Sequence, residues 1–151
     1  MPNSGNVLVF ILIVVVAIAI LYLLSSGGYT PGVAFTITPD HIQIKNNQFS
    51  QIITIKVTKT DDANKPTAFL IKLSSEANGV YAISVNNNQT ISEYMTKPLI
   101  DRDASDTLQF KVFGTLPEGY SPATTYINAQ LLYNNTTMQD KVVTLTIDIT
   151  S

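Results

Sequence analysis

Eighteen consecutive apolar residues near the N-terminus constrain this chain more than any other feature. The run Val7–Leu24 reads VLVFILIVVVAIAILYLL and contains no charged residue, glycine or proline. With a helical rise of about 1.5 Å per residue it would be roughly 27 Å long, close to the ~30 Å hydrocarbon core of a bilayer. The run therefore predicts one transmembrane α-helix. A short tail at residues 1–6 precedes it, and a glycine- and proline-containing hinge at residues 25–32 follows.

The remainder of the chain has the composition of one folded domain. Of the 151 residues only 13% are charged, and all of these lie at Asp40 or beyond. About 120 residues are enough for a single hydrophobic core and too few for two. A net charge of −2 without a basic stripe argues against a nucleic acid partner. The chain has no cysteine, which excludes disulfides, thiolate metal sites and thiol catalysis.

The N-terminal tail bears on whether the apolar run is a retained anchor or a removed leader. Signal peptides combine a basic n-region with an apolar core of about 7–15 residues. Here the tail MPNSGN has no lysine or arginine, and the apolar run is longer. We therefore expect a retained single-pass anchor in the cell membrane, with the C-terminal domain outside the cytoplasm. Two alternatives stay open: cleavage near the small residues at 25–28, and a pilin-type leader that ends at Gly5.

Three N-glycosylation acceptor sequences agree with an external position of the domain. They begin at Asn88, Asn134 and Asn135, and each falls in a predicted turn. Acceptor sequences of this kind mark surface loops in secreted proteins. These three asparagines are the candidate modification sites of a predicted glycoprotein.

Beyond the hinge the hydrophobic period changes to two, the period of a half-buried β-strand. In the clearest case Ile53, Ile55 and Val57 alternate with polar residues, and clusters of turn-forming residues separate this run from the next. Similar alternation predicts strands around residues 69–73, 108–112, 127–133 and 143–149 and, less strongly, at Val33–Thr38, His41–Lys45, Val80–Val85 and Ile91–Met95. We therefore predict an all-β, Ig-like β-sandwich of about 7–9 strands over residues 33–151.

The layout of these strands resembles a known class of surface domain. The segment IKVTKTDDANKPTAFLIKLSS is followed by DTLQFKVFGTLP, the link EGYSPATTY and the hairpin INAQLLYNNTTMQDKVVTLTIDI. Across Val33–Ile149 this layout is similar to Ig-like modules of the NEW3 and CARDB type in archaeal and bacterial surface proteins. With the N-terminal helix included, the chain resembles archaeal envelope proteins such as archaellum stator components and type IV-like pilins. The resemblance implies binding or scaffolding rather than catalysis.

The polar residues offer few candidates for chemistry. His41 is the single histidine and has no nucleophile-elbow motif beside it, so neither a Ser-His-Asp triad nor a multi-histidine metal site is expected. The segment Asp101–Asp106 holds three aspartates, and a Ca²⁺ site there is the alternative to a solvated loop in which Arg102 balances two carboxylates. Seven tyrosines leave sugar binding as an alternative to core packing, and Tyr126 is a candidate corner tyrosine.

Taken together, the sequence predicts a non-enzymatic, membrane-anchored interaction or scaffold protein, acting as an accessory subunit of a membrane complex or envelope machine. Its partners would be membrane lipid, through the helix, and other membrane or envelope proteins, through exposed sheet edges. An oligomer is compatible with this prediction. A pilin-like subunit of a surface filament is the alternative function. No catalytic, cofactor-binding or metal-binding residue is predicted.

Overall fold

The computed structural model describes residues 4–26, 29–116 and 123–151, with side chains described from residue 6 to residue 20 of the first range. The chain divides into two compact units, Met1–Thr30 and Pro31–Ser151. Residues 27–28 of the predicted hinge lie outside the described residues, as do residue 117 and residues 118–122 of the predicted link. So do residues 1–3 of the predicted tail.

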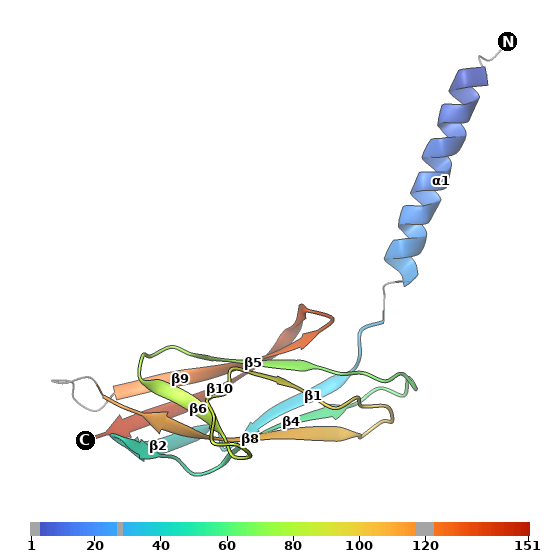
Figure 1. The fold of residues 1–151 in the computed structure, drawn as a ribbon. Helices are drawn as coiled ribbons and strands as arrows, with labels where there is room; N and C mark the ends of the chain where they lie inside the picture. The colour runs from blue at the N-terminus through green and yellow to red at the C-terminus, as the bar shows by residue number, and fades with distance from the viewer. Residues whose placement is uncertain (1–3, 27–28, 117–122) are drawn as a thin grey trace. The chain divides into compact units, whose positions relative to one another are not determined.

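The first unit contains a single helix, α1 (Ser4–Ser26), which includes the whole predicted apolar run (Figure 1). The helix begins three residues before Val7 and ends two residues after Leu24, so Ser25 and Ser26 are helical rather than part of a hinge. Within the part of the chain that the structure describes, no helix meets the combined length and hydropathy of a membrane-crossing helix. The transmembrane part of the fold prediction is therefore not confirmed.

The second unit is a β-sandwich of ten strands in two five-stranded sheets (Figure 1). In one sheet, here called the β8 sheet, the order is β1, β4, β8 and β3, and β6 also pairs with β8. In the other, the β10 sheet, the order is β2, β10, β9, β5 and β7. The pairing of β2 with β10 is parallel, whereas the other strand pairs are antiparallel. The strands are β1 (Val33–Thr38), β2 (His41–Lys45), β3 (Gln48–Phe49), β4 (Ile53–Lys59), β5 (Leu70–Ser75), β6 (Val80–Ser84), β7 (Glu93–Met95), β8 (Ser105–Gly114), β9 (Ala123–Tyr133) and β10 (Thr136–Thr150).

The strand boundaries follow the sequence pattern closely, but the strand count does not. Both β1 and β2 have the predicted bounds, while β6 and β7 are shorter than predicted. The prediction of about 7–9 strands is slightly low, since the described residues form ten. One reason is β3, whose two residues are too few to show any alternation and become a strand only by pairing with Phe113 and Gly114 of β8.

The core lies between the inward faces of the two sheets. Ile53, Ile55 and Val57 of β4 are fully buried, as are Leu145 and Ile147 of β10 in the facing sheet. Lys56, one position from Ile55, is exposed. The predicted assignment of inner and outer faces on β4 is therefore confirmed. Burial of such apolar side chains is the main favourable term in the stability of the sandwich.

The turn between β9 and β10 explains how two asparagines can stand next to each other in a tight hairpin. Asn134 and Asn135 have φ angles of 49° and 60°. A two-residue turn with positive φ at both positions matches the right-handed twist of the paired strands, and asparagine tolerates this backbone better than most residues. Further along β10 the pairing register shifts between Thr137 and Val142, where five positions on β10 correspond to two on β9.

Candidate interaction surfaces

The three predicted acceptor asparagines all lie at exposed positions between strands. Asn88 lies between β6 and β7 with a φ of 55°, and Asn134 and Asn135 form the tip of the β9–β10 hairpin. The threonines that complete the three acceptor sequences, at positions 90, 136 and 137, are exposed as well. The predicted location in a turn is confirmed for Asn134 and Asn135, whereas Asn88 directly follows the turn at residues 85–87. Their use for glycosylation stays a prediction.

His41 lies in a polar cluster on the outer face of the β10 sheet. Its Nε2 is 2.6 Å from Asp148 Oδ2, and the Thr124 hydroxyl donates to Asp148 Oδ1 at 2.6 Å. The hydrogen bond from Thr124 and, after it, the one to His41 hold the pKa of Asp148 below its ordinary value. In a catalytic triad the imidazole bonds the hydroxyl that it activates. Here the Asp148 carboxylate lies between the Thr124 hydroxyl and the His41 imidazole, so this arrangement is not that of a triad. The cluster therefore ties β2, β9 and β10 together at the surface.

The predicted acidic loop has a structural partner in the opposite sheet. Asp106 Oδ2 accepts hydrogen bonds from the Tyr94 hydroxyl at 3.0 Å and from the Lys97 amide at 2.9 Å. Burial raises the pKa of Tyr94, and the hydrogen bond and negative charge of Asp106 raise it further. Since Tyr94 belongs to β7 and Asp106 to β8, this contact links the two sheets.

The remainder of this loop does not form the Ca²⁺ site that the sequence analysis considered as an alternative. Arg102 forms an ion pair with Asp62 of another loop, with 3.3 Å between Nη1 and Oδ1. Over the described ranges, no group of three or more His, Cys, Asp or Glu side chains is placed to hold a metal ion. Asp101 and Asp103 are exposed at the surface.

Lys59 is a fully buried cation that sequence reasoning missed. Its Nζ donates to Asp61 Oδ1 at 2.5 Å and also to the carbonyls of Asp61 and Ala63. The other carboxylate oxygen of Asp61 accepts from the Gly32 amide at 2.6 Å. This cluster therefore fastens the start of the sandwich to the turn after β4. The signal in the sequence was the phase of position 59, which continues the inward series Ile53, Ile55 and Val57.

An aromatic row crosses the outer face of the β8 sheet, and the sequence analysis did not find it. Phe49 of β3 and Tyr81 of β6 both lie directly opposite Phe113 of β8. The ring centroids of Phe49 and Phe113 are 5.1 Å apart. Phe49 is 59% exposed and Tyr81 is 49% exposed. The signal was Phe113, an aromatic residue at a position where the alternation of Leu108, Phe110 and Val112 predicts a polar one.

Tyr126, the candidate corner tyrosine, does not make the expected bond. Its ring is 37% exposed on the outer face of β9. Its carbonyl accepts from the Glu76 amide at 3.1 Å. Among the described residues, no hydrogen bond of its hydroxyl is found. The corner-tyrosine prediction is therefore wrong.

Comparisons with known proteins identify no family for this chain. No protein-family model matches the sequence, and no curated protein is found as a relative. Solved structures that are similar include the ASH/PapD-like domain of human CEP192, with 10% identity over 78% of this chain and 84% of that one, at a TM-score of 0.41. The chaperone DraB of E. coli is 7% identical over 78% of this chain and 54% of its own, at a TM-score of 0.42.

A β-glucosidase from Listeria innocua is also similar, with 6% identity, a TM-score of 0.48 and coverage of 80% of this chain. This chain spans only 16% of the glucosidase chain. No family match supports the resemblance to archaellum components or pilins. The β-sandwich assignment therefore stands on the strand order and core of this chain itself.

Proposed function

We propose that this chain is a non-enzymatic, membrane-anchored protein whose β-sandwich acts outside the cytoplasm as an interaction module of the cell envelope. The observation that carries the proposal is the apolar run Val7–Leu24, which stands directly before a sandwich domain. Large apolar side chains of α1 between Val7 and Ile20 are exposed, from 38% at Val14 to 71% at Leu8. A helix that is apolar on all sides needs apolar surroundings, and a bilayer provides them.

The outer surface of the sandwich supports a role in binding. Apolar and aromatic side chains such as Phe49, Tyr81 and Met95 are about half exposed or more on its sheets. Aromatic and methionine side chains are enriched where protein surfaces meet. The partners we propose are therefore other membrane or envelope proteins, reached through the sheet faces and edges.

Membrane anchoring is tested by flotation of the full chain with lipid vesicles and by extraction at alkaline pH. The double variant Val14→Lys/Val15→Lys places two cations at the middle of α1, each at a cost of about 2.5–3.5 kcal/mol in a bilayer. The matched control Thr36→Lys/Thr38→Lys adds the same charge to exposed positions of β1. The native chain and the control should float and resist extraction, whereas the helix variant should remain in the soluble fraction. An intact native chain in the soluble fraction would contradict the anchor.

The interaction role has a separate test in native membranes. Thr36→Cys and Asn88→Cys place single thiols at two exposed positions of a chain that has no cysteine of its own. A defined protein crosslinked from either position supports the interaction module. Recovery of the monomer alone from both positions, and from detergent extracts, would contradict it.

The alternative of a filament subunit is distinguished by the N-terminus of the chain purified from membranes. A start at Met1 or Pro2 agrees with a retained anchor. A start at Asn6 would instead favour pilin-type processing after Gly5. Mass spectrometry of the N-terminal peptide separates these outcomes.

A further inference from the structure

Exposed apolar side chains of the sandwich gather in two patches on the outer faces of opposite sheets. The Lys111 patch, on the β8 sheet, consists of Phe49, Ile52, Tyr81, Ile83, Lys111 and Phe113. The Glu93 patch, on the β10 sheet, consists of Leu70, Lys72, Glu93, Met95 and Val142. Five members of these patches are large apolar residues more than two-fifths exposed: Phe49, Ile52, Tyr81, Met95 and Val142.

The Lys111 patch places one cation among apolar side chains. Ile83 of β6 lies directly opposite Lys111. On the other side of β8, the Ser50 amide bonds the Val112 carbonyl and Ile53 is paired with Phe110. Two exposed residues, Gln51 and Ile52, therefore lie opposite the single residue Lys111.

The neighbouring aromatic row completes this patch. Phe113 is two positions from Lys111 on β8, so both side chains are on the same face. The outward positions of β1, β4, β6 and β8 carry two lysines, Lys56 and Lys111, and no carboxylate. The patch is thus apolar and aromatic, with a positive charge at its centre.

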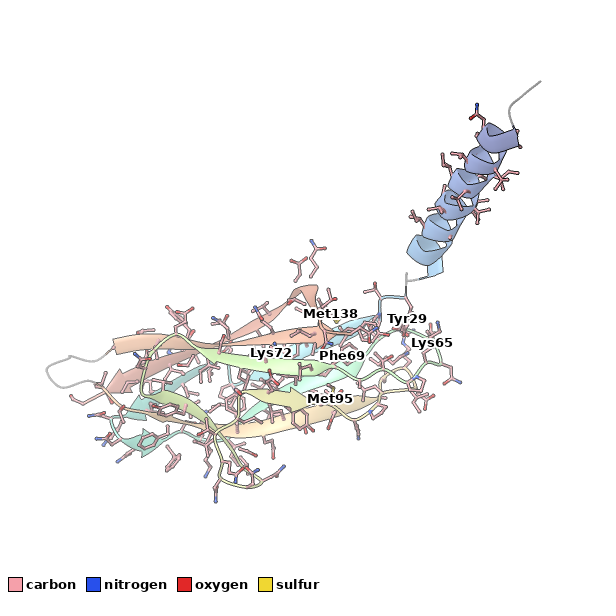
Figure 2. All side chains as sticks on the ribbon, turned by 45° about the horizontal axis from the view of Figure 1, so that its top comes forward. Tyr29, Lys65, Phe69, Lys72, Met95 and Met138 are labelled. Carbon is pink, nitrogen blue, oxygen red and sulfur yellow. The ribbon has the colours of Figure 1, made fainter. Side chains whose placement is uncertain are left out.

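The Glu93 patch has the same plan with a carboxylate at its edge. Leu70 lies opposite both Met95 and Leu132. In this apolar row Met95 is exposed, Leu70 is half-buried and Leu132 is buried. Two residues further along β5, Lys72 lies opposite Glu93. Figure 2 labels Lys72 and Met95, which come from the neighbouring strands β5 and β7. The Lys72 ammonium is 3.8 Å from the Glu93 carboxylate, and the Glu93 side chain is 58% exposed, so this carboxylate is open to a second cation.

We propose that the Lys111 patch of one copy docks on the Glu93 patch of a second copy. Apolar rows then cover each other, and Lys111 faces a carboxylate. Contact between two Lys111 patches would bring like charges together, which disfavours a symmetric arrangement. Because the two patches lie on opposite sheets, each copy keeps one patch uncovered after the first contact. Such a contact is heterologous and continues into a row or a ring.

This inference rests on the proposed function, because it names the partner of the proposed interaction module as another copy of the chain. Each patch is small compared with the interfaces of stable complexes, so the contact is weak in dilute solution. Anchoring in one membrane would raise the effective concentration of the copies and strengthen the assembly.

The experiment uses full-length chain in detergent solution, where copies can meet whether or not α1 crosses a bilayer. Copies with Ile52→Cys are mixed with differently tagged copies with Met95→Cys and then oxidised. The proposal expects disulfide-linked mixed dimers in excess over those from a mixture of Thr36→Cys with Met95→Cys. A yield no higher than that of the Thr36 mixture, or dimers that form chiefly between two Ile52→Cys copies, would overturn it.

Charge reversal distinguishes a specific contact between the copies from disulfides formed by random encounters. Lys111→Glu in the first copy, or Glu93→Lys in the second, should each lower the mixed-dimer yield about fivefold or more. Together they restore an opposite pair and should return the yield to within about twofold of the original. Lys56→Glu in the first copy is the matched control on the same sheet and should change little. Reversals that fail to rescue each other overturn the proposal. Vesicle flotation is measured separately, so either result stands without the other.

Discussion

At the scale of single residues, β4 offers the sharpest test of the sandwich. Ile55 is fully buried between the sheets, and the adjacent Lys56 is exposed. Ile55→Asp should unfold the domain, because an unpaired buried carboxylate costs several kcal/mol and total stability is only about 5–15 kcal/mol. Lys56→Asp should change the free energy of unfolding by less than about 1 kcal/mol. Urea denaturation followed by circular dichroism measures both, and equal midpoints would contradict the observed register.

Lys59 shows why alternation alone does not separate core positions from surface positions. It follows Ile53, Ile55 and Val57 in phase and is as fully buried as they are. A buried cation is tolerated only when it is paired and hydrogen bonded. Here the partners are a carboxylate and two carbonyls, all within the four residues that follow. A sequence pattern records the phase of the lysine but not this wrapping of the chain around its ammonium group.

At the scale of strands and turns, the sequence predicted the strand bounds that depend on neighbouring residues alone. The bounds of β1 and β2 follow from alternation and turn residues, and the structure has them where they were expected. The two-residue β3 and the extra residue opposite Lys111 exist only through pairing with β8. The aromatic row could not be predicted for the same reason. Its members lie far apart in the sequence and meet only once the register of three strands is set.

The β9–β10 turn gives a prediction at this scale. In unglycosylated protein, Asn135→Gly should raise the free energy of unfolding by up to about 1 kcal/mol, because glycine adopts positive φ without steric strain. Asn135→Val should lower it by about 1–2 kcal/mol, since a β-branched residue is strained there. Denaturant midpoints measure both changes.

The matched control is Asn86→Val. Asn86 also lies in an exposed turn, but its φ angle is not positive. The substitution should have little effect on stability. If Asn135→Val and Asn86→Val lowered the free energy of unfolding equally, the positive φ at position 135 would not explain why asparagine is suited to it.

At the scale of the whole molecule, the chain separates a helix with exposed apolar side chains from a domain that contains its own core. Every residue of the hydrophobic core cluster, from Val33 to Ile149, lies in the second unit. A compact unit with its own core is the physical definition of a domain that can fold alone. The sequence indicated this division through the change of hydrophobic period after the apolar run.

The division predicts that a fragment starting at Pro31 folds cooperatively and melts at the temperature of the domain in the full chain. It keeps both backbone anchors of Gly32, whose amide donates to Asp61 Oδ2 and whose carbonyl accepts from the Thr60 amide at 2.9 Å. A fragment starting at Val33 loses both bonds, each worth about 0.5–1.5 kcal/mol or more where a charged group takes part. Its free energy of unfolding should be about 1–3 kcal/mol lower. Scanning calorimetry with thermal refolding measures this difference, and a Pro31 fragment that shows no cooperative transition would mean that the helical unit is required for the sandwich to fold.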